Sequence, residues 1–470
     1  MFERLSSFVK GVMGMNADAY SKMGVQNPIN SEMETALTTW IDLYKGDAPW
    51  LARNKQSLKL PSRIAESLAT TVTVEAKIEV TGSQRAELIN QIITDMMADL
   101  PANVEYGAAM GGIAFKPYFD GKEIAIDYVQ ADDFYPVAFT SKKEITAAMF
   151  VERLIRGDKV YSRVEFHNME GDKYTIQNRA FVGRMIDDYG FEIPLTQIPE
   201  WAEIQPELTL TGMTAPLFAY MRIPFGNKID PKSPLGVSAY ADAIDLIKEA
   251  DIQFQRLLWE YEGSELAIDA NEEAFAMTLK GDPILPVGRE RLYRTNKFDP
   301  KQMSGGELLK TFSPAIRDEA YIRGLNELMK QIEDKVGLAR GTLSDPKADV
   351  RTAEEVRTNR QKTYVTIVTI QRALEKAIKG LVSAIDELMT LYNIAPAGLI
   401  QVNCAWDDSV ITDPDVERER DRQEVREGIM AAWQYRAKWY GETEEVAKAA
   451  IAEIKQEEID DNKLMGFGEQ

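Results

Sequence analysis

Cysteine and histidine are almost absent from this chain, with Cys404 and His167 as the single representative of each. One cysteine cannot form a disulfide within the chain, and a structural zinc site needs about four Cys or His ligands, so one copy can build neither. A reducing compartment fits this composition best. We expect Cys404, in an apolar strand, to be a buried small residue, and His167, at a strand end, to be a surface side chain.

Long apolar runs and nucleotide-binding motifs are missing as well. No stretch approaches about 18 uncharged apolar residues, and Glu3, Arg4 and Lys10 interrupt the apolar N-terminal segment, which therefore does not have the pattern of a signal peptide or a membrane helix. We expect residues 1–27 to form a short amphipathic or mobile arm. The sequence has no P-loop, no G-x-G-x-x-G and no H-E-x-x-H pattern. We therefore expect no cofactor, no metal and no enzymatic activity.

Basic residues are scarce relative to acidic ones. The 470 residues include 55 Lys and Arg against 75 Asp and Glu, which gives a formal net charge of -20. Such a chain stays soluble and does not adhere to nucleic acid over a wide surface, because its charge repels the phosphates. The hydrophobic fraction of 44% is ordinary for a globular protein. At about 150 residues per domain, the length corresponds to roughly three domains.

Neighbouring acids leave one enzymatic alternative open, a metal-dependent nuclease, which would need several carboxylates converging on one site. Such pairs occur at Asp132–Asp133, Asp407–Asp408 and Asp460–Asp461. Adjacent residues of a strand point to opposite faces, which weakens each pair as a chelator, and we favour solvated turns. Magnesium-dependent DNA cleavage that is lost in Asp132→Asn or Asp407→Asn would favour the nuclease.

The period of the apolar residues changes along the chain. Residues 31–115 have helical spacing, with Gly46 ending the first helix and Pro101 interrupting a later one. Residues from about 113 to 225 are β-branched and aromatic with a period of two, which predicts an antiparallel β region. From Pro234 a helix of about 40 Å is expected. The row of apolar residues along one face of this helix is interrupted by Asp251, which we interpret as a local solvated gap.

The second half of the chain predicts very long helices around short inserts. A compact insert at 264–313 precedes a helix at 314–337, a polar loop, and a helix of about 43 residues with a bend at Gly380. A strand near 399–412 and further helices follow, with Asp413 as N-cap and Pro414 at the first helical position. Helices this long must bury their stripes, which favours packing against copies in a ring. A helical scaffold of one or two chains is the alternative.

Three stretches resemble a known family, and they occur in its order and spacing. They are "WIDLYKGDAPW", "SPLGVSAYADAIDLIKEADIQFQRLLWEYEGSE" and "GLARGTLSDPKADVRTAEEVRTNRQKTYVTIVTIQRALEKAI". The most specific parts run from Ser238 to Asp251 and from 351 to 356. The chain is similar here to the portal proteins of tailed double-stranded DNA bacteriophages, of the siphophage type found in phages of Gram-positive hosts.

The resemblance implies a portal fold of the α+β class, mainly helical, with wing, stem, clip and crown. It implies an N-terminal arm at 1–27, a wing at 28–234, stem helices at 235–263 and 314–337, a clip at 264–313, a tunnel loop at 338–350, a long wing helix with its return strand at 351–412, and a crown at 413–470. The family forms a dodecameric ring at a unique capsid vertex of the virion, through which DNA is packaged and ejected.

The resemblance also implies partners and candidate site residues. The partners are further copies of the chain, double-stranded DNA, the terminase large subunit, a head-tail adaptor protein, and the major capsid and scaffolding proteins, with no membrane; assembly takes place in the bacterial host cytoplasm. For the tunnel loop, the residues expected to face DNA are Arg340, Thr342, Ser344 and Lys347. For docking of the motor and the adaptor, the expected clip residues are Lys280, Asp282, Arg289, Arg291 and Arg294.

Overall fold

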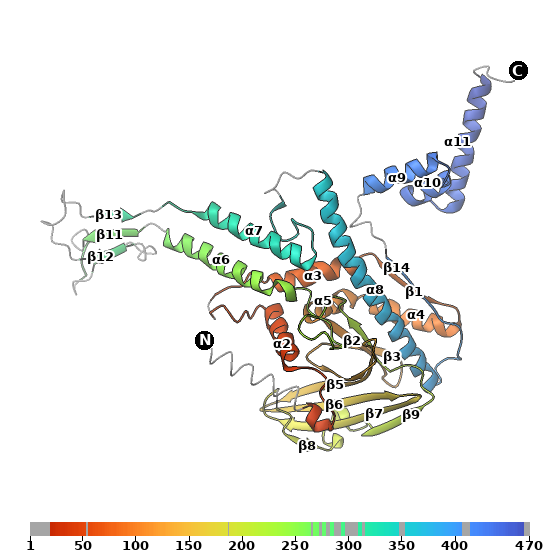
Figure 1. The fold of residues 1–470 in the computed structure, drawn as a ribbon, viewed down its shortest axis with the longest axis horizontal. Coiled ribbons are helices and arrows are strands. Elements are labelled where there is room, and N and C mark those ends of the chain that lie inside the picture. Colours follow the sequence, from red (N-terminus) through yellow and green to blue (C-terminus); the bar gives the residue numbers. More distant parts are fainter. Residues whose placement is uncertain are drawn as a thin grey trace. The chain divides into compact units, whose positions relative to one another are not determined.

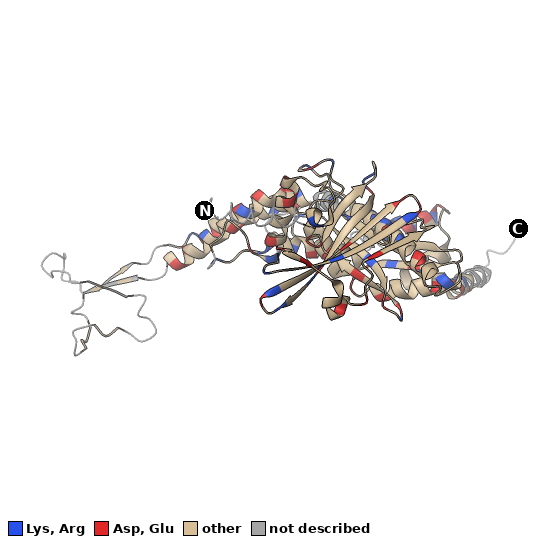
Figure 2. Ribbon diagram, turned by 90° about the horizontal axis from the view of Figure 1, so that it is seen from below, with Lys and Arg blue, Asp and Glu red and all other residues tan. Residues whose placement is uncertain are grey.

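The structure is a computed structural model, and it divides the chain into two units, Met1–Cys404 and Ala405–Gln470. It describes residues 19–52, 55–186, 188–264, 267–271, 275–278, 283–285, 293–296, 309–312, 315–346, 353–406 and 414–464. Among the described helices, none has the length and apolarity that a bilayer crossing needs. Basic and acidic residues are interspersed along the ribbon of the described strands and helices (Figure 2).

The first unit has a group of helices near its start, of which the first, second and fourth pack on one another while the third packs on a neighbouring strand. They are α2 (Ser31–Lys45), α3 (Leu60–Thr73), α4 (Gln84–Met96) and α5 (Leu100–Met110). Asn30 caps α2 by accepting a hydrogen bond from the Met33 amide, and Gly46 ends it with a left-handed φ of 87°, so the predicted end of this helix is confirmed. Pro101 stands in the first turn of α5, where its missing N–H costs nothing, and therefore marks a start.

Two antiparallel sheets follow, which confirms the predicted β region. The first has six strands, β4 (Phe134–Phe139), β5 (Ile145–Arg156), β6 (Lys159–Glu170), β7 (Lys173–Gly183), β8 (Phe191–Ile193) and β9 (Glu207–Thr211). The second has the order β10 (Ala219–Arg222), β2 (Gly112–Phe119), β3 (Ile124–Val129). Alternation along β5 directs Met149 and Val151 into a core with Val164 and Phe181, because successive side chains point to opposite faces.

Two helices, α6 (Ile244–Gly263) and α7 (Asp318–Val336), run side by side as a hairpin (Figure 1). Between them the chain forms a small sheet in which β11 (Ala267–Asn271) pairs in parallel with β12 (Tyr293–Asn296) and antiparallel with β13 (Leu309–Phe312). Arg317 joins the two helices at this end, because its guanidinium donates to Glu260 at 3.1 and 2.9 Å. The compact insert predicted between the two helices therefore includes this small sheet at the end of the hairpin.

Helix α6 starts later than the sequence pattern predicted. A helix was expected from residue 235, but the chain remains non-helical until the short turn Ala241–Ala243. The reason is close packing: a Cβ on Gly236 would lie 2.0 Å from the Gly111 carbonyl oxygen, and the Ala239 amide donates to the Ala108 carbonyl at 2.8 Å. These contacts with α5 and its C-terminal turn hold the backbone extended.

Asp251 on α6 is buried, so the expected solvated gap is wrong. Its side chain is 1% exposed and accepts hydrogen bonds from Trp50 Nε1 at 3.0 Å, from the Leu58 amide at 2.8 Å and from Ser57 Oγ at 3.1 Å. A buried carboxylate is stable only when its lone pairs are satisfied, and here three donors from one segment satisfy them. Asp251 thus connects α6 to the segment that precedes α3.

Helix α8 (Ala353–Leu391) has 39 residues and passes across β10 and β2 (Figure 1). At 1.5 Å per residue it is about 58 Å long. It continues through Gly380, where an added Cβ would lie 3.2 Å from the Cβ of Ala219, so this glycine permits close approach of the sheet. The return strand β14 (Gln401–Trp406) pairs with β1 (Ala76–Thr81), and Cys404 is half-buried rather than fully buried.

The described residues of the second unit form three helices, α9 (Pro414–Arg426), α10 (Ala432–Tyr440) and α11 (Glu444–Leu464). Pro414 begins α9 as predicted, while the expected cap Asp413 lies outside the described residues. The packing within this unit joins α10 to both of its neighbours.

Candidate functional site

The passage from α7 to α8 is built around the turn that ends α7. Gly337 has a left-handed φ of 77°, and its amide donates to the Glu333 carbonyl, which satisfies the end of the helix. The Leu338 amide reaches the same carbonyl at 2.9 Å. A Cβ on Gly337 would lie 2.3 Å from Thr366 Oγ1 on α8, so glycine serves both the turn and the close approach of the two helices.

One buried carboxylate holds the chain that follows. Glu333 is 0% exposed, and its Oε1 accepts hydrogen bonds from the amides of Gly341, Leu343 and Ser344 at 3.0, 2.6 and 2.8 Å. Its Oε2 accepts the Ser344 hydroxyl at 2.8 Å. Bonds to a charged acceptor are stronger than neutral ones. We call residues 338–346 the pinned loop, because these contacts fix it to α7.

A second polar contact continues the pinned loop beyond Ser344. The Asn326 side-chain oxygen, on the same helix but nearly two turns before Glu333, accepts the Asp345 amide at 2.7 Å. Asn326 is 7% exposed, so its amide is committed to this contact rather than to solvent. Glu333 and Asn326 of α7 therefore both accept hydrogen bonds from backbone amides of the loop. These bonds set the position of the loop relative to the helix.

The cation of the pinned loop is already partnered in this chain. Arg340 Nη2 lies 2.7 Å from Asp334 Oδ2, and Lys362 on α8 donates to the Asp334 carbonyl at 2.6 Å and lies 3.3 Å from Oδ1. Burial raises the pKa of Asp334, but the hydrogen bonds from Arg340 and Lys362 outweigh burial and leave the pKa lowered. Asp334 therefore stays ionised between the two cations and links the loop to both helices.

The remaining loop residues singled out from the sequence differ in placement. Thr342 is exposed, and its hydroxyl donates to the Ala339 carbonyl at 2.7 Å. Ser344 is buried on Glu333, so in this chain its hydroxyl supports the loop. Lys347 lies outside the described residues. Contact with DNA stays a prediction for the exposed members.

Most of the clip residues predicted from the sequence lie outside the part of the chain that the structure describes. Lys280, Asp282, Arg289 and Arg291 lie outside the described residues. Arg294 lies on β12, opposite Asp269 of β11, and its side chain is not described. Their docking role stays a prediction.

Sequence reasoning missed Glu333, Asp334 and Asn326, the residues that hold the loop. The sequence nevertheless contained a signal that could have identified two of them, Glu333 and Asp334. Acidic side chains in the last turn of a helix oppose the helix dipole, so Glu333 and Asp334 at the end of α7 need specific donors to be stable there. The donors are the loop amides and the two cations described above.

The single histidine is a core residue, and the expectation of a surface side chain is wrong. His167 is 3% exposed; its Nε2 lies 2.7 Å from Glu165 Oε1 and its Nδ1 lies 2.7 Å from the Tyr174 hydroxyl. The Glu165 carboxylate can only accept, so Nε2 donates to it and Nδ1 accepts the proton of the Tyr174 hydroxyl, whose oxygen accepts the Leu217 amide at 3.0 Å. The proton of neutral His167 is therefore on Nε2. Burial lowers the pKa of His167, although Glu165 opposes this.

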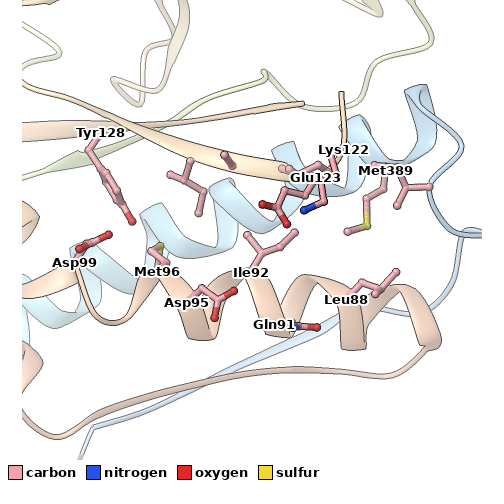
Figure 3. Close-up of a pocket in the computed structure, with 14 residues that line it drawn as sticks. Leu88, Gln91, Ile92, Asp95, Met96, Asp99, Lys122, Glu123, Tyr128 and Met389 are labelled. Carbon is pink, nitrogen blue, oxygen red and sulfur yellow. The ribbon is translucent and has the colours of Figure 1, made fainter. Parts of the chain in front are cut away.

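A groove of about 480 Å³ lies between α4, β3 and the end of α8 (Figure 3). Its middle is apolar, lined by Leu88, Ile92, Met96, Ile126 and Met389. Asp95 of α4 and Asp99, the residue before α5, make one side acidic, and β3 is an edge strand of its described sheet. The groove offers an apolar surface with an acidic rim.

The acid pairs are not brought together in the described part of the chain. Asp133 forms an ion pair with Arg153, and Asp132 precedes it in the same turn. Asp407 and Asp408 lie outside the described residues, and the side chains of Asp460 and Asp461 are not described. Among the described residues, no group of three or more His, Cys, Asp or Glu side chains is arranged to hold a metal ion.

Comparison with known proteins places the pinned loop within one continuous match. The family model described as "Phage portal protein, SPP1 Gp6-like" matches residues 34–464, a range that includes α7, the pinned loop and α8. No curated protein matches the chain. A solved structure described as "Neck of native GTA particle computed with C12 symmetry" is similar at 12% sequence identity and a TM-score of 0.41, with 88% of this chain and 94% of that chain covered.

Proposed function

The chain belongs to the SPP1 Gp6-like family of phage portal proteins, and from this premise we propose that it forms a dodecameric ring at one capsid vertex. The ring is the channel through which double-stranded DNA is packaged and ejected. The family match over residues 34–464 carries this proposal. A portal is a structural component of the virion rather than an enzyme, so ATP hydrolysis belongs to a terminase motor.

The proposed channel has four parts, and we propose an element of the chain for each. We assign the α6–α7 hairpin to the stem, the small sheet β11–β13 to the clip, the antiparallel sheets and α8 to the wing, and α9–α11 to the crown. The terminase large subunit and the head-tail adaptor dock on the clip, where Arg294 stands on β12. Capsid and scaffolding proteins surround the wing.

The loop between the two long helices is the proposed contact with moving DNA. A conduit must touch phosphates weakly, because a basic lining would retain DNA through counterion release. The acidic chain, with a formal net charge of -20, meets this requirement. Arg340 is shared with Asp334 and so offers only part of its charge, while Lys347 adds a second cation in the sequence of the loop.

Electron microscopy of the purified full chain tests the ring directly. We expect symmetric rings with a central hole and close to twelve copies. Compact particles of one or two chains, at several salt concentrations, would contradict the proposal and favour a helical scaffold.

The loop needs a separate test that leaves its anchor intact. Deleting residues 341–348 is expected to spare the ring and to impair packaging or retention of DNA, but it also removes the donors that satisfy Glu333. Lys347→Gln is a more specific test than the deletion, because it keeps residues 341–345 and removes only one positive charge. We expect rings of normal appearance and fewer DNA-filled heads. Lys379→Gln, an exposed lysine of α8 paired with Glu375, is the matched control and should fill heads normally.

A further inference from the structure

Helices α9 and α10 of the second unit bring two arginines and one tyrosine together. Arg418 and Arg422 lie one turn apart on α9, and the Nε of each donates to the phenolic oxygen of Tyr435 on α10, at 3.2 and 3.0 Å. A phenolic oxygen has two lone pairs and one proton. Because the guanidinium groups take both lone pairs, the Tyr435 proton is directed to a further acceptor.

The electrostatics at this oxygen agree with the geometry. Burial raises the pKa of Tyr435, but the hydrogen bonds and charges of Arg418 and Arg422 outweigh burial and leave the pKa lowered. The local potential is therefore positive, although α9 carries five acidic residues against four arginines. An acceptor that completes the cluster should carry negative charge.

Aromatic rings fix the orientation of Arg418. Its Cζ lies 5.8 Å from the ring centroid of Trp439 and 5.8 Å from that of Tyr440. Arg418 also forms a hydrogen bond with the Tyr440 side chain, and an arginine stacked on aromatic faces keeps its remaining N–H groups at the edge of its planar fork, where an oxyanion can bind. Such a held fork loses less side-chain entropy on binding than a mobile one.

Neighbouring basic side chains form close ion pairs with carboxylates, whereas Arg418 and Arg422 do not form such close pairs among the described residues. Arg436 forms two bonds with Glu442, at 2.9 and 2.7 Å, and Lys438 donates to the buried Asp421 at 2.7 Å. Arg422 has only a 3.4 Å contact with exposed Glu419. For Arg418 no carboxylate partner occurs among the described residues of α9 to α11.

Asp421 positions the aromatic side of the cluster. It is 0% exposed and accepts Trp439 Nε1 at 2.9 Å in addition to Lys438. This bond joins α9 to Trp439, whose ring packs on Arg418. A buried hydrogen bond therefore fixes the aromatic side of the cluster. The arrangement is preorganised in the chain itself.

We propose that Arg418, Arg422 and the Tyr435 hydroxyl form a phosphate-binding site, and that its ligand is a backbone phosphate of double-stranded DNA. Three converging donors, two of them charged, match the oxygens of a phosphodiester. The surrounding acidic residues limit the contact to about one phosphate, which gives weak binding without sequence preference. The identification of DNA as the source of the phosphate rests on the proposed portal function.

Fluorescence anisotropy with the full chain tests the site, using a labelled DNA duplex of about 30 base pairs at low salt, near 50 mM. The double variant Arg418→Gln, Arg422→Gln is expected to weaken binding about tenfold and to lower the salt slope by about one. Arg426→Gln with Lys448→Gln, which removes the same charge from the same unit, is the control and should bind nearly as the parent does. Equal loss in both variants, or in neither, would overturn the site.

Two further measurements separate the remaining outcomes. Tyr435→Phe, which removes the hydroxyl and keeps the ring, should also weaken DNA binding, and unchanged thermal melting will show that α9 and α10 remain folded. If inorganic phosphate quenches Trp439-dependent fluorescence in the parent but no variant changes DNA affinity, the DNA assignment is overturned. Rings seen for the same samples by microscopy report on the portal function independently, because loss of the site leaves ring formation intact.

Discussion

At the scale of single residues, the junction between α6 and the rest of its unit depends on the carboxylate of Asp251. Asp251→Ala would leave Trp50 Nε1 and the Leu58 amide without their acceptor. We expect the free energy of unfolding to fall by about 2–4 kcal/mol, the cost of unsatisfied buried donors. Chemical denaturation followed by tryptophan fluorescence measures it. Glu249→Ala, exposed on the same helix, is the control, and an equal effect of the two variants would refute the assigned role.

The buried histidine gives the chain a pH dependence with a definite sign. Burial lowers the pKa of His167 in the folded chain, so below about pH 6.5 the unfolded chain takes up a proton that the folded chain refuses. Stability is therefore expected to decline as the pH falls from about 7.5 to 5.5. His167→Gln should flatten this decline in melting temperature. His167 is the single histidine, so no second imidazole contributes.

One carboxyl group titrates in the same window with the opposite sign. Burial raises the pKa of Asp42 to about 6, so protonation of the folded chain at lower pH adds stability. Asp42→Asn should therefore steepen the decline that His167→Gln flattens. A parallel change in both variants would show that neither residue controls the pH response.

At the scale of elements, the pinned loop is an extension of α7. Glu333→Gln replaces a charged acceptor of four hydrogen bonds by a neutral one. We expect amide hydrogen exchange in a peptide covering residues 338–346 to become at least about tenfold faster, since bonds to a charged acceptor are the stronger ones. Glu327→Gln, an exposed acid of the same helix, should leave this peptide unchanged. Unchanged exchange in Glu333→Gln would mean that backbone turns alone hold the loop.

Local signals predicted the elements better than their junctions. Gly46 and Pro414 mark real helix ends, and the period of two identified the antiparallel sheets, because these features depend on neighbours in sequence. The start of α6 and the environment of Asp251 depend on contacts with residues 111 and 50–58, far away in the sequence. A pattern of single residues carries no record of such partners.

In the candidate site, too, features set by neighbours in the sequence were predicted and features set by distant contacts were not. The position of the loop between two helices was predicted, and the glycine at residue 337 marks its start. The role of Ser344 was not, because a serine in a polar stretch has the same pattern whether it faces solvent or a buried glutamate. Arg340 was recognised as a loop cation, but its partner Asp334 became evident only from the fold.

At the scale of the whole molecule, the net charge of -20 on each copy sets how the proposed ring responds to salt. Like-charged copies repel one another, and salt screens this repulsion beyond a Debye length of about 8–10 Å. Raising the salt concentration from about 50 to 200 mM should therefore increase the fraction of rings over single chains. Mass photometry of the purified protein measures this fraction. A decrease would indicate that ion pairs between copies dominate over the net repulsion.

Two contacts made by α6, one near its C-terminal end and one two turns after its start, have a mechanical consequence. Arg317 ties α6 to α7 beside the small sheet, while Asp251 ties α6 to the segment before α3. A helix held at two points bends little between them, so a force applied at the small sheet is transmitted along α6 from Glu260 to Asp251. The neighbouring helix α7 carries Glu333, which holds the pinned loop, in its last turn. Load placed on the small sheet by a docking partner would therefore arrive at the loop as displacement, over a path made of two helices and a few buried hydrogen bonds.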